Sequence, residues 1–92
     1  FYVGKFYFRH KHYWSALERF QGILEEYPHQ GLDEEAIYFS WRCYYHLGRH
    51  ELAESELNKL RIRFPDGTYF KRAKELKRFQ REKGAKKWIL GG

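Results

Sequence analysis

The sequence contains one cysteine, two prolines and no methionine, and none of its apolar runs is long enough to cross a bilayer. Cys43 has no second cysteine with which to form an intrachain disulfide, so cysteine usage does not decide the redox compartment. No charged segment followed by an apolar run marks a targeting peptide at the amino terminus. Because residues 1–8 already follow a helical pattern with no capping residue before them, we expect the chain to begin inside a longer protein.

The side-chain patterns of enzymes and of metal sites are also missing. No motif indicates a nucleophile with its base, a pair of catalytic carboxylates or a glycine loop that cradles phosphate. Cys43 lies among aromatic residues in a helical pattern and is therefore predicted to be a small buried hydrophobic residue. His46 and His50 are separated by Gly48, which is predicted to end a helix between them and so removes the geometry of a zinc-binding helix. We therefore expect no catalytic activity, no metal and no cofactor.

Charge is distributed unevenly along the chain, whose formal net charge is +6. Residues 1–60 carry seven Lys and Arg against nine Asp and Glu, whereas residues 61–92 carry eleven against three. This asymmetry predicts a basic carboxyl-terminal surface suited to an acidic protein, a nucleic acid or an anionic lipid headgroup, or else a solvated helix face. Aromatic residues make up 21% of the chain and recur at helical spacing, so we expect most of them to fill space between packed helices.

The chain repeats itself at an offset of 37 residues. The offset pairs Tyr7 with Tyr44, Ala16 with Ala53, Phe20 with Leu57, Ile23 with Leu60 and Pro28 with Pro65. A period of this length, with alanine in the second helix of each unit and proline at its end, is typical of a helical solenoid. The two alanines are predicted to let the helices of each hairpin approach closely.

Apolar spacing and turn residues predict where the helices lie. A first helix includes residues 1–8, and a second runs from about residue 13 to residue 27, where Pro28 stops it. Asp33 is predicted to cap a third helix, with Glu34 and Glu35 in its first turn, and Gly48 is predicted to end it. A fourth helix spans about residues 51–63, and residues 66–68 form a capped turn that starts a fifth.

These helices group into two hairpins, residues 1–28 and residues 33–65, followed by a capping helix at 68–84 and a basic tail at 85–92. The fifth helix has Arg78 and Arg81 where the third has Trp41 and Tyr44, so it departs from the repeat and is predicted to have one wet face. The predicted fold is an all-α solenoid in one segment, residues 1–84, made of two helix-turn-helix repeats and a cap.

The recurring residues resemble the tetratricopeptide repeat pattern, in which a small residue, an aromatic, an alanine, an aromatic and a proline follow in order. The first unit matches this pattern at Gly4, Tyr7, Tyr13, Ala16, Phe20 and Pro28. The second unit matches it at Tyr44, Gly48, Ala53, Leu57 and Pro65. Trp41 stands at the usual small position and His50 at the usual aromatic one, so looser or locally adjusted helix packing is expected there. The resemblance implies a protein-binding scaffold.

Several segments further resemble the BamD family of bacterial outer-membrane assembly lipoproteins: Val3-Gly4-Lys5-Phe6-Tyr7, Tyr13-Trp14-Ser15-Ala16, Arg19-Phe20 and the Tyr27-Pro28 ending. This resemblance covers residues 1–82 and corresponds to the C-terminal half of the family. It implies a non-catalytic scaffold on the periplasmic face of the outer membrane, held there by a lipid anchor outside this segment. It also implies that these repeats bind the POTRA domains of the BamA-type barrel insertase, together with other lipoproteins of the assembly machine.

The docking surface of that family uses basic residues near the end of a second helix, and Arg19 matches one of its arginines. Glu25 and Glu26 stand where at least one basic residue is expected, so other arginines and the basic last helix are predicted to contribute instead. The predicted partner-binding residues are Arg19, Arg42, Arg49, Arg72, Arg78 and Arg81.

Two other functions fit the sequence. A cell-envelope scaffold of the CpoB type has similar repeats and similar Tyr-Pro or Phe-Pro links. A nucleic-acid-binding module would use the basic residues of 71–87 beside Phe79 and Trp88. No recognised nucleic-acid motif accompanies those residues and helical steps spread their charges around the helix, so no nucleic-acid partner is expected. The carboxylate clamp of chaperone-binding tetratricopeptide proteins is missing, because Asn58, the single asparagine, lies on a second helix.

Overall fold

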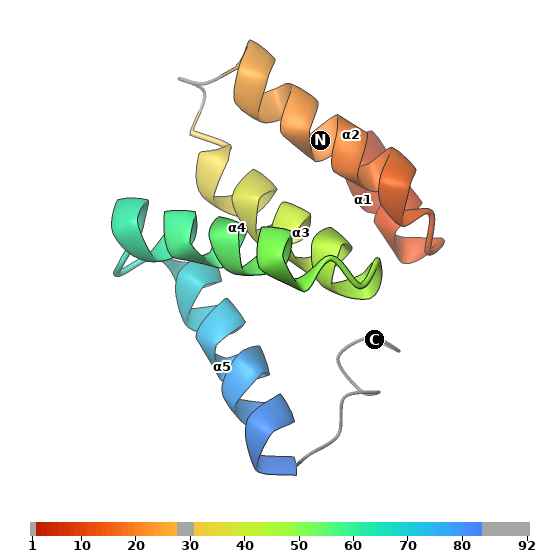
Figure 1. Ribbon diagram of the computed structural model, residues 1–92. Coiled ribbons are helices and arrows are strands. Elements are labelled where there is room, and N and C mark those ends of the chain that lie inside the picture. Colours follow the sequence, from red (N-terminus) through yellow and green to blue (C-terminus); the bar gives the residue numbers. More distant parts are fainter. Residues whose placement is uncertain (1, 28–30, 84–92) are drawn as a thin grey trace.

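The computed structural model describes residues 2–27 and 31–83, with side chains up to residue 79. These residues contain no strand and form five helices: α1 (Tyr2–Arg9), α2 (Tyr13–Glu26), α3 (Asp33–His46), α4 (His50–Arg63) and α5 (Thr68–Lys83). The first two helices form one hairpin and the next two a second, and α5 descends from the end of α4 (Figure 1). The predicted all-α architecture of tandem hairpins and a fifth helix is confirmed. Pro28 and the predicted tail at 85–92 lie outside the described residues.

The two hairpins turn through the same backbone conformation. Lys11, between α1 and α2, has a φ of 64°, and Gly48, at the equivalent place between α3 and α4, has a φ of 76°. In both turns, the residue with positive φ and the residue after it donate backbone N–H hydrogen bonds of 2.9–3.1 Å to carbonyl groups of the preceding helix. In the first turn Lys11 bonds to Phe8 and His12 to Tyr7; in the second, Gly48 bonds to Tyr45 and Arg49 to Tyr44. The repeat thus extends to backbone hydrogen bonding, and it places a lysine where left-handed geometry favours glycine.

α3 is buried on two sides and belongs to both hydrophobic cores. Seven of its fourteen residues are buried, against four of fourteen in α2 and in α4. One side of α3 joins a cluster with the first hairpin, made of Ala16, Leu17, Phe20, Ile23, Ala36 and Cys43. The other side joins a cluster with α4 and α5, made of Ile37, Tyr38, Trp41, Ala53, Leu57, Leu60, Phe70 and Ala73. The third helix therefore links the two repeats into one body.

The two hairpins bring their helices together through different residue pairs. In the first, a Cβ on Gly4 would lie 3.0 Å from the ring of Phe20, so that contact requires a glycine or a shift of the ring. In the second, Trp41 stands at the position of Gly4 and Leu57 at the position of Phe20, and Trp41 is fully buried. The larger residue of the pair therefore lies on the second helix in the first hairpin and on the first helix in the second hairpin, where the pair of Trp41 and Leu57 is also the bulkier one. The second hairpin thus buries a tryptophan at the position where the first hairpin has a glycine.

The expectation that Asp33 caps α3 is wrong. Leu32 occupies the capping position without a side-chain hydrogen bond, and Asp33 is the first helical residue. The Asp33 carboxylate instead accepts a hydrogen bond from the guanidinium of Arg63, at the end of α4, over 2.5 Å. An acid in the first turn still suits the positive end of the α3 dipole, but its partner is a side chain from another helix.

The cap of α5 comes from α3. One oxygen of the Glu34 carboxylate accepts the backbone N–H groups of Tyr69 and Phe70, at 2.8 and 3.3 Å. These are among the amides that a helix leaves without an internal partner in its first turn. Gly67 lies directly against the same carboxylate, where a Cβ would overlap it. The start of α5 is therefore fixed by a side chain 35 residues earlier in the chain.

α5 packs on α4 through a more polar contact than the one that joins α3 to α2. Lys77 of α5 pairs with Glu54 of α4 over 2.6 Å. In the contact between α3 and α2, the residues 37 positions before Lys77 and Glu54 are Ser40 and Leu17, and both are buried. Among the α5 residues with described side chains, Phe70 and Ala73 are buried. The departure of α5 from the repeat therefore has a physical cause in the polar side of α4 that it meets.

Replacing Lys11 by glycine is expected to stabilise the protein. A left-handed residue with a Cβ costs about 1–2 kcal/mol, and the larger conformational entropy of glycine in the unfolded chain offsets about 0.5–1 kcal/mol of that gain. We expect the free energy of unfolding in urea to rise by about 0.5–1 kcal/mol. Gly48→Ala, at the equivalent turn position, is the matched control and should lower it. A Lys11→Gly protein less stable than the wild type would contradict this account of the turn.

Replacing Gly67 by alanine is expected to destabilise the protein by displacing the Glu34 carboxylate from the start of α5. Loss of a capping acceptor costs about 1–2 kcal/mol of the free energy of unfolding. In a Glu34→Ala background the carboxylate is already absent, so Gly67→Ala should lower the free energy of unfolding by less than half as much as it does in the wild type. The measurement is a double-mutant cycle in urea. Equal costs in the two backgrounds would show that the cap is not what the methyl group disturbs.

Candidate protein-docking surface

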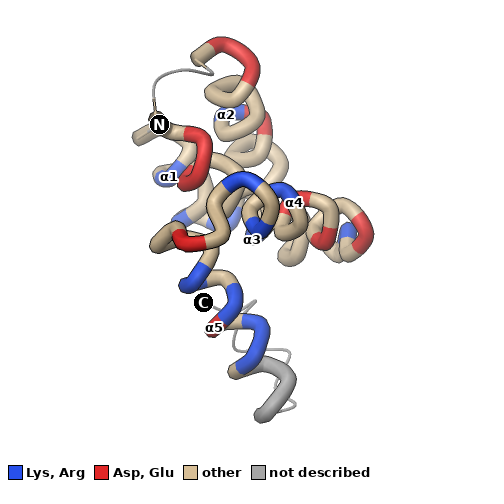
Figure 2. Tube along the Cα trace, turned by 90° about the vertical axis from the view of Figure 1, so that its left-hand side faces the viewer, with Lys and Arg blue, Asp and Glu red and all other residues tan. Residues whose placement is uncertain are grey.

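The six arginines predicted to bind a partner do not form one surface. Arg42 and Arg72 share one tyrosine ring, Arg49 lies at the α3–α4 turn, Arg19 lies in a groove between α1 and α2, and Arg78 lies in a groove between α4 and α5. The side chain of Arg81 is outside the described part of the chain. Lys and Arg residues follow α5 along most of its described length (Figure 2). The prediction therefore separates into several sites, which differ in their neighbours.

The pair formed by Arg42 and Arg72 lies where α3 meets α5. The Cζ atom of each guanidinium is 5.9 Å from the ring centroid of Tyr38, which is itself buried. Arg42 also lies 4.9 Å from the ring of Phe8 in α1, and Arg72 lies 4.9 Å from the ring of Tyr69 in α5. We call these five residues the first-helix face, because α1, α3 and α5 are the first helices of their units.

Aromatic contacts hold these guanidiniums without using their hydrogen-bond donors. Within the described residues, neither Arg42 nor Arg72 forms an ion pair with a carboxylate. Attraction to a ring leaves the terminal N–H groups of a guanidinium able to bind a carboxylate, while the Nε atom of Arg42 is itself buried without a hydrogen-bond partner among the described residues. The first-helix face can therefore offer two oriented arginines to an acidic group of a partner.

One carboxylate borders the first-helix face. Glu35 pairs with Lys5 of α1. Burial raises the pKa of Tyr69 above its ordinary value, and a hydrogen bond with the same Glu35 is the second cause of that rise. Because Lys5 offsets the charge of Glu35, the charges of Arg42 and Arg72 remain uncompensated, and the face is positive.

His46 supports the first-helix face from the side of the first hairpin. Its ring stacks on Tyr13 with centroids 4.2 Å apart and planes 7° from parallel, and it meets Phe8 edge-on at 5.6 Å. Burial, and after it the positive charges of Arg42 and Lys11, lower the pKa of His46 to about 4. The imidazole is therefore neutral at physiological pH and acts as a flat packing surface behind Phe8.

A second basic surface follows the groove between α4 and α5, which has a volume of about 560 Å³. The groove is lined by Leu57, Lys71, Lys74, Glu75, Lys77 and Arg78. We expected helical steps to spread the charges of α5 around the helix. This holds for Arg72, which faces Tyr38, but Lys71, Lys74, Lys77 and Arg78 all line the same groove. Lys77 is paired with Glu54, and Lys74 lies 4.9 Å from the ring of Phe70. Part of this charge is therefore used within the molecule.

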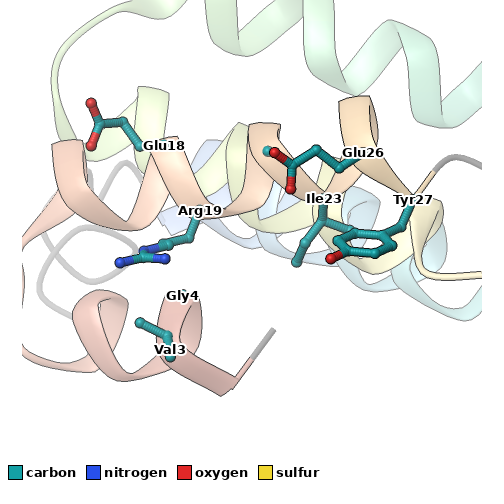
Figure 3. A pocket seen from close by; sticks show the side chains of 8 residues that line it. Val3, Gly4, Glu18, Arg19, Ile23, Glu26 and Tyr27 are labelled. Atoms are coloured by element: carbon teal, nitrogen blue, oxygen red, sulfur yellow. The ribbon is translucent and has the colours of Figure 1, made fainter.

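Arg49 and Arg19 lie apart from both basic surfaces. The Cζ atom of Arg49 is 5.7 Å from the ring centroid of Trp14, which is 54% exposed. Arg19 points from α2 toward α1 into a groove of about 440 Å³ whose other charged residues are Glu18 and Glu26 (Figure 3). With two carboxylates and one guanidinium, the charged residues that line this groove have a net negative charge.

The residues predicted to pack the repeats lie in three environments. Buried ones are Gly4, Ala16, Phe20, Ala53 and Leu57; half-buried ones are Tyr7, Tyr13 and Tyr44; exposed ones are Gly48 and Pro65. Exposed aromatics also occur at Tyr2, Phe6, Trp14, Tyr27 and Phe79, so the expectation that aromatic residues fill the core does not hold for these five. Four of them, Tyr2, Phe6, Trp14 and Tyr27, belong to the first hairpin.

The cysteine and the two histidines that could suggest catalysis or metal binding pack against other side chains of the fold. Cys43 is buried as predicted, and burial raises the pKa of its thiol to about 12, so the thiol stays protonated and unreactive at neutral pH. His46 and His50 belong to different helices and contact Tyr13 and Tyr45. Across the described ranges, no group of three or more His, Cys, Asp or Glu side chains could hold a metal ion. No helix in those ranges is long and apolar enough to span a membrane.

Comparison with protein families gives one match, to a model described as Tetratricopeptide repeat, over residues 7–76. The match covers the second helix of the first hairpin, the whole second hairpin and the first half of α5. The chain belongs to the tetratricopeptide repeat family. Tetratricopeptide repeats are typically non-catalytic modules that bind other proteins. Comparison with curated proteins and with solved structures gives no match.

Sequence reasoning missed the aromatic half of the first-helix face. Tyr38 lies four residues before Arg42, and Tyr69 lies three residues before Arg72, and both spacings place the two side chains on one side of a helix. That spacing was a usable signal for each pair. The meeting of the two pairs at one ring was not readable, because it depends on how α5 is docked against α3.

His46 is expected to make the protein sensitive to mild acid. The folded protein keeps its imidazole neutral down to about pH 4, whereas the imidazole of the unfolded chain takes up a proton near pH 6.5. The unfolded state therefore binds more protons in this window, and the free energy of unfolding falls as the pH falls from 6.5 toward 4. Thermal unfolding at pH 7 and pH 5 should show a smaller loss for His46→Phe, which keeps a ring on Tyr13. Equal losses in both proteins would assign the acid sensitivity to other groups.

Proposed function

We propose that this tetratricopeptide chain is a non-catalytic docking scaffold whose first-helix face binds an acidic surface of a partner protein. The observation that carries the proposal is that Arg42 and Arg72, from two different helices, lie at the same distance from one buried ring. The docking of α5 against α3 therefore brings both guanidiniums to the same ring. Two oriented guanidiniums suit carboxylates, which they can bind through paired hydrogen bonds.

The surroundings of the two arginines supply the other parts of a docking site. Phe8 and Tyr69 are half-buried and border the guanidiniums on either side, so they offer apolar contact to residues next to a partner's acid. Aromatic side chains commonly carry affinity at protein interfaces, whereas exposed charges mainly set the association rate and the register. Because Glu35 is already paired with Lys5, it does not repel an acidic partner strongly.

Within this role we infer a BamD-like function, in which the chain docks the POTRA domains of a BamA-type barrel insertase and neighbouring assembly lipoproteins. The location would then be the periplasmic face of the bacterial outer membrane, reached through a lipid anchor outside this segment. The residues 3–7 and 13–16 and the pair Arg19-Phe20 support this reading by their resemblance to the family. Since Glu18 and Glu26 line the groove of Arg19, we assign the binding of partner acids to Arg42 and Arg72.

Two alternatives remain as competitors. A general cell-envelope scaffold of the CpoB type would use the same face and differ in its partner. Binding of nucleic acid is favoured by one observation, the groove between α4 and α5 lined by Lys71, Lys74 and Arg78. We rank it last, because Glu75 lies in that groove and Lys77 is neutralised by Glu54.

Charge reversal of Arg72 is expected to weaken partner binding. The measurement is titration calorimetry of the chain against purified periplasmic domains of a barrel insertase, at two salt concentrations. Arg72→Glu should reduce the affinity about tenfold, or roughly 1.4 kcal/mol, and added salt should weaken binding of the wild type. Arg72 is exposed, so the substitution leaves the cores intact. Arg61→Glu is the matched control, because Arg61 is an exposed arginine of α4 away from the first-helix face, and it should change the affinity less than twofold.

Three other outcomes would overturn parts of the proposal. Insertase domains that bind wild type and Arg72→Glu equally would remove the first-helix face as the site. Insertase domains that do not bind, while an acidic peptide binds in an Arg72-dependent way, would remove the BamD-like assignment and keep the docking face. An oligonucleotide that binds and is lost on Lys71→Glu combined with Lys74→Glu would favour the nucleic-acid alternative.

A further inference from the structure

The groove between α4 and α5 has an excess of positive charge that the first-helix face does not use. The charged residues that line it are Glu75, Lys71, Lys74, Lys77 and Arg78. Lys77 is paired with Glu54, so four cations less two carboxylates leave a net charge of +2. By the same count, the charged residues of the groove between α1 and α2 sum to −1, and those of the groove between the hairpins sum to zero. We call the groove between α4 and α5 the basic groove.

Three cations of the basic groove form a line along α5 (Figure 2). Lys71, Lys74 and Arg78 follow one another at steps of three and four residues, so they lie on one side of the helix over about 10 Å. All three are exposed. Arg72 lies on a different side of α5, against the ring of Tyr38. The line is therefore a surface distinct from the first-helix face.

The fold holds the basic groove in place. The start of α5 is capped by Glu34 of α3, and the buried side of α5 contributes Phe70 and Ala73 to the second core. The Nζ atom of Lys74 lies 4.9 Å from the ring of Phe70, which positions the ammonium without neutralising it, because an aromatic ring has no net charge. The cations are therefore presented by a helix whose position does not depend on a partner.

The residue type indicates a different partner from that of the first-helix face. Three of the four cations in the basic groove are lysines, whereas the first-helix face has two arginines beside aromatic rings. The planar guanidinium fits one carboxylate through paired hydrogen bonds, but the lysine ammonium is a compact point charge on a flexible stem. Such charges suit anions that are numerous and not fixed in one geometry, as phosphates are at the surface of a bilayer.

The remaining side chains favour a lipid surface over a nucleic acid. Among the described side chains of α5, the exposed aromatic one is Phe79, which follows Arg78 and is 42% exposed. An aromatic ring beside cations suits the boundary between headgroups and acyl chains, whereas a single ring does not stack successive bases. The buried side of α5 also packs on α3 and α4, so the helix cannot enter a major groove of DNA.

We propose that the basic groove binds the phosphate headgroups of an anionic lipid bilayer, so that α5 lies against a membrane surface. Lys71, Lys74 and Arg78 meet the phosphates, and Phe79 lies at the edge of the contact. The proposal does not depend on the identity of the protein partner, because that partner is assigned to Arg42 and Arg72. Separate substitutions therefore test the two contacts.

The test is cosedimentation of the full chain with vesicles made of equal parts of phosphatidylglycerol and phosphatidylcholine. The wild type should bind these vesicles, bind less as salt is added, and bind vesicles of phosphatidylcholine alone at least about tenfold more weakly. Each lysine near an anionic bilayer contributes about fivefold to the partition coefficient. Lys71→Gln combined with Lys74→Gln should therefore lower it by at least about tenfold.

The matched control removes the same number of charges outside the basic groove. Arg9→Gln combined with Arg72→Gln changes two exposed arginines, one on α1 and one on the other side of α5, and should lower the partition coefficient less than about threefold. Broadening of amide signals by a gadolinium-chelating lipid in the same vesicles maps the contact. Amides of residues 71–78 should broaden before those of α1.

Four results speak against the proposal. Equal losses in the groove variant and in the control would mean that binding follows net charge and not this groove. Unchanged binding of the groove variant would assign the membrane contact to another segment, the basic tail at 85–92 included. An oligonucleotide that displaces the vesicles and depends on Lys71 and Lys74 would make a nucleic acid the occupant. A wild type that binds no vesicles, while insertase domains still bind it through Arg72, would remove the lipid contact and leave the proposed function standing.

Discussion

The burial of α3 on two sides is the constraint on which the rest of the structure depends. Its Ala36 and Cys43 side completes the core of the first hairpin, and its Ile37 and Trp41 side completes the core of the second. A helix that is apolar around most of its circumference is stable only inside a larger body. Both hairpins therefore depend on α3 to complete their cores, and the two repeats should fold as one unit. The acids at the start of α3 extend this role, since Asp33 pairs with α4 and Glu34 caps α5.

Much of the fold was predictable because the decisive residues act within one turn of their own positions. Gly48 ended α3 as expected, and the 37-residue offset placed both hairpins, since a repeat is a comparison of the chain with itself. Asp33 was misassigned for a physical reason. An acid at the start of a helix satisfies the chemistry of a cap and of a remote ion pair equally well, and the choice depends on where Arg63 arrives at the end of α4. The cap that Glu34 gives to α5 depends in the same way on tertiary packing.

The docking surface was predictable only in part, because charge alone does not distinguish one arginine from another. Arg19 and Arg42 are both helical arginines next to aromatic residues in the sequence. In the fold, Arg19 shares its groove with Glu18 and Glu26, whereas Arg42 shares the Tyr38 ring with Arg72. What separates them is the sign of the neighbouring charge and the ring that orients the guanidinium. Both depend on which helices meet, which a pattern along one helix does not contain.

The contact between each first helix and the second helix before it changes in polarity along the solenoid. The residues at one repeated position are Val3, Ser40 and Lys77, so the contact is hydrogen-bonded at α3 and ionic at α5, and the corresponding residue of α1 is apolar. Exposed ion pairs contribute about 0–1 kcal/mol, whereas burying a valine or phenylalanine side chain contributes about 1.5–3 kcal/mol. The first and last described helices thus differ in kind: α1 exposes apolar side chains, while α5 exposes charged ones that can meet an acidic partner.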